Sequence, residues 1–169
     1  MNKLIVLNGI QGSGKTTLGE FIAKKHNFKF IKIDTFYEKV PRVDNQVEWF
    51  EDIEYRENVY DAFEKAVVDS LKESGVIIEA TGVDKRFAGL VENLKKHNVR
   101  MIKFLLKIDE DLAFERVTDR NKTDHPIKVT EDDLKYVVSK IDELDTSGYT
   151  IIDANQAAED IYRDVLNYF

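Results

Sequence analysis

The sequence predicts a three-layer α/β fold in which helices cover both faces of a parallel β-sheet. Short apolar runs of strand length alternate along the chain with longer segments in which apolar residues recur at helical spacing. The short runs are mostly apolar rather than alternating, as expected of strands buried on both faces. The chain has 169 residues and contains no repeat or low-complexity linker, so we expect a single domain over residues 1–169.

Five strands and six helices are expected in order along the chain. The strands are expected at residues 4–8, 29–33, 76–80, 101–108 and 149–153. The helices are expected at residues 15–26, 47–73, 84–97, 109–120, 130–145 and 155–168. The two prolines, Pro41 and Pro126, mark interruptions at about 34–46 and 121–129, because proline is excluded from helix interiors and central strands.

Composition excludes several classes of protein. The chain carries 25 Lys and Arg against 32 Asp and Glu, a formal charge of −7, and has no basic run, so long nucleic acids are disfavoured although a strand end could enter a local basic cleft. The absence of cysteine excludes disulfides, thiolate catalysis and cysteine zinc sites. Met1-Asn2-Lys3 leads directly into the first strand, and no apolar run approaches the roughly 20 residues of a membrane span. We therefore expect a cytoplasmic protein without membrane contact, as a monomer or homodimer.

A phosphate-binding loop is predicted at residues 9–16. The segment Gly-Ile-Gln-Gly-Ser-Gly-Lys-Thr fits G-x-x-x-x-G-K-[ST] and lies between an apolar strand and an amphipathic helix, whereas an unliganded glycine-rich turn would not require Lys and Thr there. Backbone N–H groups and the helix N-terminus would surround the phosphates of ATP. Lys15 would reach the β and γ oxygens, and the Thr16 hydroxyl would ligate Mg²⁺. We expect phosphate contacts from Gly9, Gln11, Gly12, Ser13, Gly14, Lys15, Thr16 and Thr17.

Two other classes of nucleotide-binding protein fit the sequence less well. Residues 121–124 match the N-K-x-D pattern with which GTPases read guanine, but a charged helix separates them from the nearest strand. The D-x-x-G spacing at residues 145–148 also follows that pattern instead of preceding it. Motor-type and AAA-type ATPases usually need a longer chain and oligomer-completing arginines. The length therefore favours a small-molecule kinase.

The chain resembles the small P-loop kinases, a group that includes polynucleotide 5′-hydroxyl kinases, gluconate-type kinases, zeta-toxin-like and antibiotic phosphotransferases and, more distantly, adenylate kinase. The resemblance rests on the phosphate loop, Ile33-Asp34, residues 76–82 with Arg86 beyond, and Arg116 with Arg120. It implies the strand order 2-3-1-4-5, an acceptor-binding region at about 34–60 and a lid at about 116–130.

Two acidic residues are expected at the carboxyl edge of the sheet. Asp34 follows the second strand, and in the resembling kinases the matching Asp accepts or orients the proton of the acceptor hydroxyl. Its alternative is a helix or turn cap. Glu79 ends the third strand at the second acidic motif, where a carboxylate normally holds Mg²⁺ through water. Direct metal contact, a role against the acceptor and a structural hydrogen bond all remain open for Glu79.

The acceptor side is predicted less sharply. Arg42 or Arg56 could neutralise an acceptor phosphate, and Thr81 and Arg86 lie where the resembling polynucleotide kinases carry acceptor-facing groups. Arg86 could instead pair with Asp84 or Glu92 on a solvated helix. Six aromatic residues could stack on a ring or simply belong to the core: Phe36, Tyr37, Trp49, Phe50, Tyr55 and Tyr60.

The predicted lid carries two arginines four residues apart, Arg116 and Arg120, which share one face of a helix. Such cations can stabilise the charge of the transferring phosphoryl group and exclude water, although pairing with neighbouring acids is the alternative. The resemblance also assigns adenine stacking to Arg120. Asn155, after the last strand, is a second adenine-binding candidate or a helix cap. His125 lies within the predicted lid, where it could contact the acceptor or a phosphate or simply be solvated.

Together these observations predict an ATP- and Mg²⁺-dependent kinase with Lys15, Asp34, Arg116 and Arg120 as catalytic residues. The favoured acceptor is a nucleoside, a nucleotide or another small hydroxylated metabolite. A polynucleotide 5′-hydroxyl end is the alternative within the class. A nucleotide-binding regulatory module with little turnover is the alternative outside it.

Overall fold

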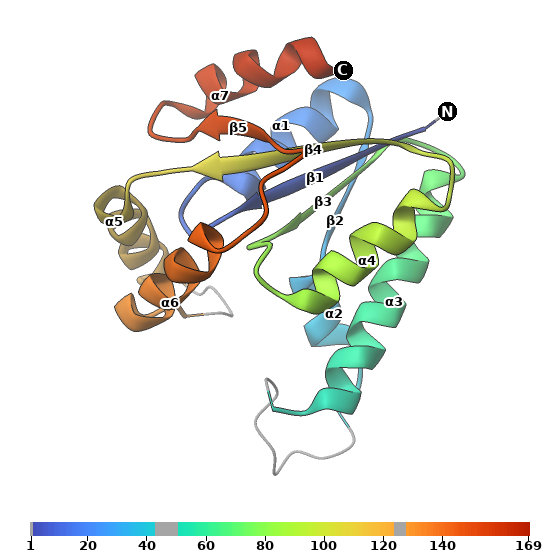
Figure 1. Ribbon diagram of the computed structural model, residues 1–169, viewed down its shortest axis with the longest axis horizontal. Helices are drawn as coiled ribbons and strands as arrows, with labels where there is room; N and C mark the ends of the chain where they lie inside the picture. Colours follow the sequence, from blue (N-terminus) through green and yellow to red (C-terminus); the bar gives the residue numbers. More distant parts are fainter. Residues whose placement is uncertain (1, 43–50, 124–127) are drawn as a thin grey trace.

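A five-stranded parallel sheet forms the centre of the computed structural model, which describes residues 2–42, 51–123 and 128–169. The strands lie in the order β2-β3-β1-β4-β5 (Figure 1), which confirms the predicted order. Central β1 pairs with β3 on one side and β4 on the other, so the segment that follows β1 leaves the middle of the sheet. The strands span Lys3–Gly9 (β1), Lys29–Lys32 (β2), Val76–Ala80 (β3), Arg100–Lys107 (β4) and Thr150–Asp153 (β5).

Helices cover both faces of the sheet. The helices α1 and α7 pack on one face, and α3, α4 and α6 pack on the other, while α2 and α5 directly follow β2 and β4 (Figure 1). The helices span Lys15–His26 (α1), Asp34–Lys39 (α2), Ile53–Leu71 (α3), Lys85–Lys95 (α4), Glu110–Asn121 (α5), Glu131–Asp142 (α6) and Ala158–Val165 (α7), with a 3₁₀ turn at Leu166–Tyr168 (η1).

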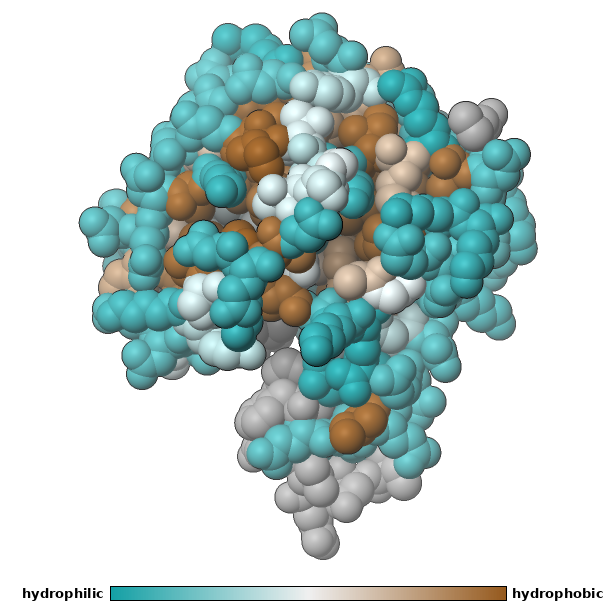
Figure 2. All heavy atoms as spheres, viewed as in Figure 1, coloured by the Kyte–Doolittle hydropathy of each residue, from teal (hydrophilic) through white to brown (hydrophobic). Residues whose placement is uncertain are grey.

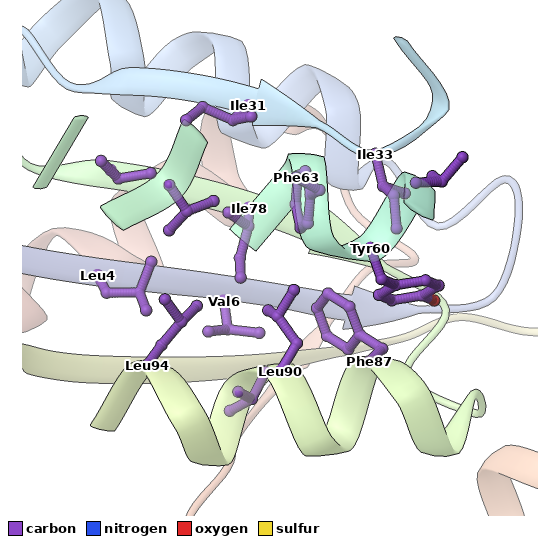
Figure 3. Packing of buried hydrophobic residues seen from close by; sticks show 14 of the residues in the cluster. Leu4, Val6, Ile31, Ile33, Tyr60, Phe63, Ile78, Phe87, Leu90 and Leu94 are labelled. Carbon is purple, nitrogen blue, oxygen red and sulfur yellow. The ribbon is translucent and has the colours of Figure 1, made fainter. Parts of the chain in front are cut away.

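The core is divided into two halves by the alternation of β1. Leu4 and Val6 point to the cluster under α3 and α4, whereas Ile5 and Leu7 point to the cluster under α1 and α7, and all four are fully buried. Figure 3 shows part of the first cluster, in which Phe63 of α3 and Phe87 of α4 belong to the same group of buried side chains as Val6 of β1. Because both sides of β1 are filled, the strand is rigidly held where it enters the phosphate loop.

The outward surface of the helices is polar. Figure 2 shows hydrophilic residues over most of the visible face, with hydrophobic residues mainly toward its middle. Among the described residues, no helix combines the length and apolar character that a bilayer crossing requires.

Two expectations about the segment after β2 were wrong. Residues 34–46 were expected to lack regular structure, but Asp34–Lys39 form helix α2, which has no buried residue and therefore leaves no apolar stripe to recognise. The following helix was expected from residue 47 but begins at Ile53, where the side chain of Asp52 accepts a hydrogen bond from the backbone N–H of Tyr55 at 2.9 Å. Residues 47–50 of that expectation lie outside the described residues.

Candidate active site

The loop between β1 and α1 depends on glycine at two positions with different surroundings. Gly12 has φ +82°, and a Cβ there would lie 2.6 Å from the carbonyl oxygen of Ala113, so the loop packs tightly against α5. Gly14 has φ +88°, and a Cβ there would meet no described atom within 4 Å. The loop is therefore fixed on its α5 side and open at Gly14, as an anion-binding cradle requires.

A cleft of about 550 Å³ lies over this loop, and residues from several separate segments of the chain line it. The loop and α1 contribute Gln11, Gly12, Gly14, Lys15, Thr16, Thr17 and Leu18. The ends of β2 and β3 and the segments after them contribute Ile33, Asp34, Glu79, Ala80, Thr81 and Asp84, and α3 contributes Tyr60. The remaining wall consists of Arg116, Arg120, Val129, Gln156, Ala157, Ala158 and Ile161. Gly9 and Ser13, predicted to contact phosphate, belong to the loop but do not line the cleft.

Lys15 lies at the centre of the site. Its Nζ donates hydrogen bonds to the carbonyl oxygens of Gly9 and Ile10, both at 2.8 Å. Burial lowers the pKa of Lys15 to about 8, against the attraction of the Glu79 carboxylate and with the repulsion of Arg120. The hydrogen-bond partners of the Lys15 ammonium are thus neutral carbonyl oxygens. A polyphosphate that enters the cleft would place negative charge beside this buried ammonium.

Thr16 and Glu79, which both line the cleft, are joined by a hydrogen bond. The Thr16 hydroxyl donates to the Glu79 carboxylate, whose oxygens lie 2.9 and 3.0 Å from Oγ1. Burial raises the pKa of Glu79, while the Lys15 charge and the Thr16 hydrogen bond oppose this rise. Glu79 thus makes the structural hydrogen bond that was one of its alternatives, and it makes it to the residue predicted to ligate Mg²⁺.

The two arginines of α5 lie in different surroundings although both line the cleft. Arg116 Nη1 donates to the carbonyl oxygens of Gly12 at 3.2 Å and Ala154 at 3.4 Å, so this side chain joins the phosphate loop to the end of β5. Arg120 has its Nε and Nη2 buried without a hydrogen-bond partner among the described residues. Burial lowers the pKa of Arg120, and the charges of Asp34 and Glu79 oppose that effect. Arg120 therefore lies in the field of the carboxylates near Lys15.

Asp34 is the first residue of α2 and is exposed to the cleft. Its charge contributes to the pKa values of Lys15, Glu79 and Arg120, which places it within electrostatic range of all three. An Asp in the first turn of a helix also interacts favourably with the helix dipole. Asp34 can therefore stabilise the start of α2 and line the cleft at the same time.

The predicted acceptor-binding arginines do not line the cleft. Arg56 Nη2 lies 2.6 Å from Asp84 Oδ2, Arg86 pairs with Glu57, and the Arg42 guanidinium lies 5.6 Å from the ring centre of Tyr55. Arg86 therefore pairs with neither of the two acids that were weighed as its partners. Thr81 does line the cleft.

One residue that lines the cleft, Asp84, was not predicted as a site residue, whereas Tyr60 was one of the six aromatic candidates. Asp84 and Tyr60 line the cleft, and the Tyr60 hydroxyl donates to Asp84 Oδ2 at 3.2 Å. Asp84 also caps α4 by accepting from the backbone N–H of Arg86 at 2.8 Å, and capping was the only signal that its sequence context offered. Tyr60 was grouped with the other aromatic residues without distinction.

The remaining aromatic candidates pack mainly on one another. Phe36 contacts Phe63 edge-on with ring centres 5.4 Å apart, and Tyr37 contacts Tyr55 with ring centres 6.0 Å apart. These contacts favour the core alternative for Phe36, Tyr37 and Tyr55. Trp49, Phe50, His125 and Pro126 lie outside the described residues.

The adenine side differs from the sequence-based expectation. Asn155 does not line the cleft, and it accepts from the Asp109 backbone N–H at 2.9 Å and donates to Asp153 at 3.0 Å. It does not cap α7 either, because the N-cap is Ala157. Gln156 lines the cleft instead, with Nε2 donating to the Asp153 carbonyl at 3.0 Å and to Asp164 Oδ2 at 2.6 Å.

In the N-K-x-D segment, Asn121 hydrogen-bonds to Val129 and so has a structural role after α5. Asn121 Nδ2 donates to the Val129 carbonyl at 2.7 Å, and its Oδ1 accepts from the Val129 backbone N–H at 3.3 Å. Asn121 thus ties together the two ends of the segment 121–129 and does not line the cleft, whereas Asp124 lies outside the described residues.

The chain is similar in sequence to known proteins. A family model described as "AAA domain" matches residues 4–144. The shikimate kinase of Staphylococcus haemolyticus is 25% identical, with 99% of this chain and 94% of that protein covered. The shikimate kinase of Thermodesulfovibrio yellowstonii is 30% identical, with 76% of this chain and 70% of that protein covered.

Solved structures show the same fold. The gluconokinase of Sinorhizobium meliloti 1021 superposes with a TM-score of 0.68 at 19% identity, with 98% of this chain and 90% of that chain covered. The shikimate kinase of Bacteroides thetaiotaomicron gives a TM-score of 0.67 at 20% identity, with 98% and 97% covered. The chain belongs to the AAA domain family and, within it, to the small P-loop kinases that use ATP to phosphorylate small molecules.

Proposed function

We propose that this protein transfers the γ-phosphoryl group of ATP to a hydroxyl group of a small acceptor held beside Asp34. The observation that carries the proposal is that Asp34 lines the same cleft as the phosphate loop, Lys15 and Arg120. A carboxylate at that edge of the sheet is where an acceptor hydroxyl has to lie for transfer from a nucleotide on the loop.

ATP would bind with its phosphates against the loop amides and Lys15. The Thr16 hydroxyl and the Glu79 carboxylate are hard oxygen donors that already lie together, and they fit Mg²⁺, which keeps several waters and takes few protein ligands beside nucleotide phosphates. When bound, Mg²⁺ neutralises phosphate charge. Glu79 would then exchange its hydrogen bond from Thr16 for a contact with the metal or its waters.

In the transfer itself, the acceptor oxygen forms a bond to the γ-phosphorus as the bond from that phosphorus to the β–γ bridging oxygen breaks, and ADP leaves. Asp34 takes the hydroxyl proton or orients it. Arg120, whose Nε and Nη2 have no partner among the described residues, supplies positive charge to the transferring oxygens. Arg116 holds Gly12 and Ala154 and so fixes the loop on which the phosphates rest.

The placement of Arg120 near the carboxylates supports the catalytic role over adenine stacking. On the adenine side we propose Gln156, Ala157 and Ile161 as contacts, since these residues line that part of the cleft. Asn155 would act indirectly, by joining the β5 loop to the start of α5 through Asp109. The proteins named shikimate kinase and gluconokinase support a small hydroxylated acceptor.

An acceptor screen tests the proposal. ADP release would be measured with Mg·ATP and shikimate, gluconate, nucleosides or a short oligonucleotide with a 5′-hydroxyl. We expect one small acceptor to raise the rate. Asp34→Asn should then lower kcat by about 10²- to 10⁴-fold, without changing the calorimetric Kd for Mg·ATP. Glu38→Gln, a change to another exposed acid of α2 that does not line the cleft, is the matched control.

Two results would contradict the proposal. A slow ADP release that no acceptor stimulates would favour a nucleotide-binding regulatory module. Preferential phosphorylation of the oligonucleotide would favour the polynucleotide 5′-hydroxyl kinase instead.

A further inference from the structure

We infer that the acceptor is a small hydroxylated molecule without negative charge, and that Asp84 determines this specificity by holding Arg56 in an ion pair outside the cleft. The inference rests on the proposed function and narrows its acceptor class. It separates this protein from the shikimate kinases and gluconokinase to which it is similar, because shikimate and gluconate are carboxylates.

The Asp84 carboxylate is the centre of a compact network. Its Oδ2 accepts from Arg56 Nη2 at 2.6 Å and from the Tyr60 hydroxyl at 3.2 Å, and its Oδ1 accepts from the Arg86 backbone N–H at 2.8 Å. The Arg56 guanidinium also hydrogen-bonds the Tyr37 hydroxyl. The side chains of Arg56 and Asp84 are only 21% and 26% exposed, so the pair is largely shielded from solvent. The Arg56 guanidinium is thus already bound by Asp84 and Tyr37.

Tyr60 forms the boundary between this network and the core. Figure 3 shows its ring at the end of the apolar cluster next to Phe87, with the hydroxyl oxygen at the outer end of the ring. Burial, together with the neighbouring Asp84 charge, raises the pKa of Tyr60, so its hydroxyl keeps its proton. The wall offered to an acceptor here is therefore a neutral phenol and a carboxylate.

The basic side chains that line the cleft belong to the phosphate end. Among the described lining residues they are Lys15, Arg116 and Arg120, and the first two contact carbonyl oxygens of the loop or of β5. Arg86 is held by Glu57 and does not line the cleft. Residues 43–50, which lie outside the described part, include two acids and neither lysine nor arginine, so that segment brings no basic side chain.

The acids of the acceptor side act together. Burial raises the pKa of Tyr37, and the hydrogen bond and charge of Arg56 oppose that rise. The charges of Asp84 and Asp34 add smaller contributions to it, so this one group lies in the field of both carboxylates. A carboxylate or phosphate on the acceptor would be repelled by these carboxylates, whereas hydroxyl groups can donate hydrogen bonds to the same oxygens. Recognition by carboxylates favours polyols and sugars over sugar acids and sugar phosphates.

Matched acceptor pairs that differ in charge test the inference. The pairs are methyl shikimate and shikimate, glucitol and gluconate, and adenosine and its 3′-monophosphate. We expect the uncharged member of the preferred pair to have a kcat/KM about tenfold or more above that of its anionic partner. Equal values, or a preference for the anion, would overturn the inference and leave the proposed kinase activity intact. Failure of every acceptor despite binding of Mg·ATP would refute the proposed function, and the inference with it.

The variant Asp84→Asn tests the assigned residue. Asn can preserve the helix cap through its amide oxygen and donate from its amide nitrogen to the Tyr60 hydroxyl, but it removes both the acceptor and the charge that hold Arg56. We expect the kcat/KM ratio of the anionic to the uncharged acceptor to rise about tenfold, as one unit of charge close to the cleft implies. A general structural defect would lower both members equally. An unchanged ratio would contradict the role of Asp84.

Glu57→Gln is the matched control, because it removes the charge that pairs with Arg86, which does not line the cleft, instead of the charge that pairs with Arg56. The acceptor ratio should stay at its wild-type value in this variant. A shift in the control equal to that of Asp84→Asn would show that any change in surface charge has the same effect, and it would also overturn the inference.

Discussion

Binding of Mg·ATP should be accompanied by uptake of a proton at Lys15. In the free protein, burial lowers the pKa of this lysine to about 8. A bound polyphosphate places negative charge against the ammonium and raises its pKa back toward the ordinary value of about 10.5. Between these two pKa values the nucleotide complex holds a proton that the free protein has released, so affinity falls as pH rises above about 8.

The size of the effect follows from the two pKa values. At pH 7 about nine-tenths of the free lysine is already protonated, at pH 8 about half, and at pH 9 about one-tenth. Binding should therefore take up about 0.5 proton at pH 8 and about 0.9 at pH 9. The apparent Kd should be about tenfold weaker at pH 9 than at pH 7, a difference of about 1.4 kcal/mol.

Calorimetry in buffers with different ionisation enthalpies measures this uptake directly. The observed binding enthalpy at pH 8 should change linearly with buffer ionisation enthalpy, with a slope that gives the protons taken up. Lys15→Met should bind more weakly and abolish the slope, whereas Lys32→Met, a change to a lysine paired with Glu20 at 2.8 Å, should keep it. A binding enthalpy that does not depend on the buffer at pH 8 would refute the reasoning, as would a slope that survives in Lys15→Met.

Three further outcomes are expected. Glu79→Gln should raise the Mg²⁺ concentration for half-maximal activity about tenfold, and an unchanged Mg²⁺ titration would exclude a metal-linked role for this carboxylate. Arg120→Ala should lower kcat about 10²-fold or more with little change in Mg·ATP affinity. Arg116→Ala should instead weaken Mg·ATP binding, because it removes the hydrogen bond that holds Gly12. If kinetics and calorimetry show the same defect in both variants, this division of roles is wrong. Gly89→Ala should stabilise the protein by about 0.5–1 kcal/mol in urea unfolding, since Gly89 lies within α4 and a Cβ there meets no atom within 4 Å; a loss of stability would contradict this.

Local sequence was sufficient to predict the loop whose residues Gly12, Gly14, Lys15 and Thr16 line the cleft. The positions of Gly12, Gly14, Lys15 and Thr16 follow from one continuous motif between a strand and a helix, so their relative placement depends on short-range geometry. Sequence also predicted that Asp34 would come at the edge of the sheet, because the strand before it was legible as an apolar run. The sequence did not predict helix α2, which begins there, because this short helix has no buried residues and so no apolar pattern of its own. Its stability depends on contacts with the rest of the fold.

Sequence by itself determined the parallel sheet, the phosphate loop and the class of reaction, because strand periodicity and a contiguous motif are local properties of the chain. Only the tertiary structure decided which charges meet. It joins Glu79 to Thr16 across 63 residues of sequence and Arg56 to Asp84 across 28. The sequence offers each of these side chains many partners of suitable charge. The distance that selects one of them is fixed only when the sheet order and helix packing bring the segments together.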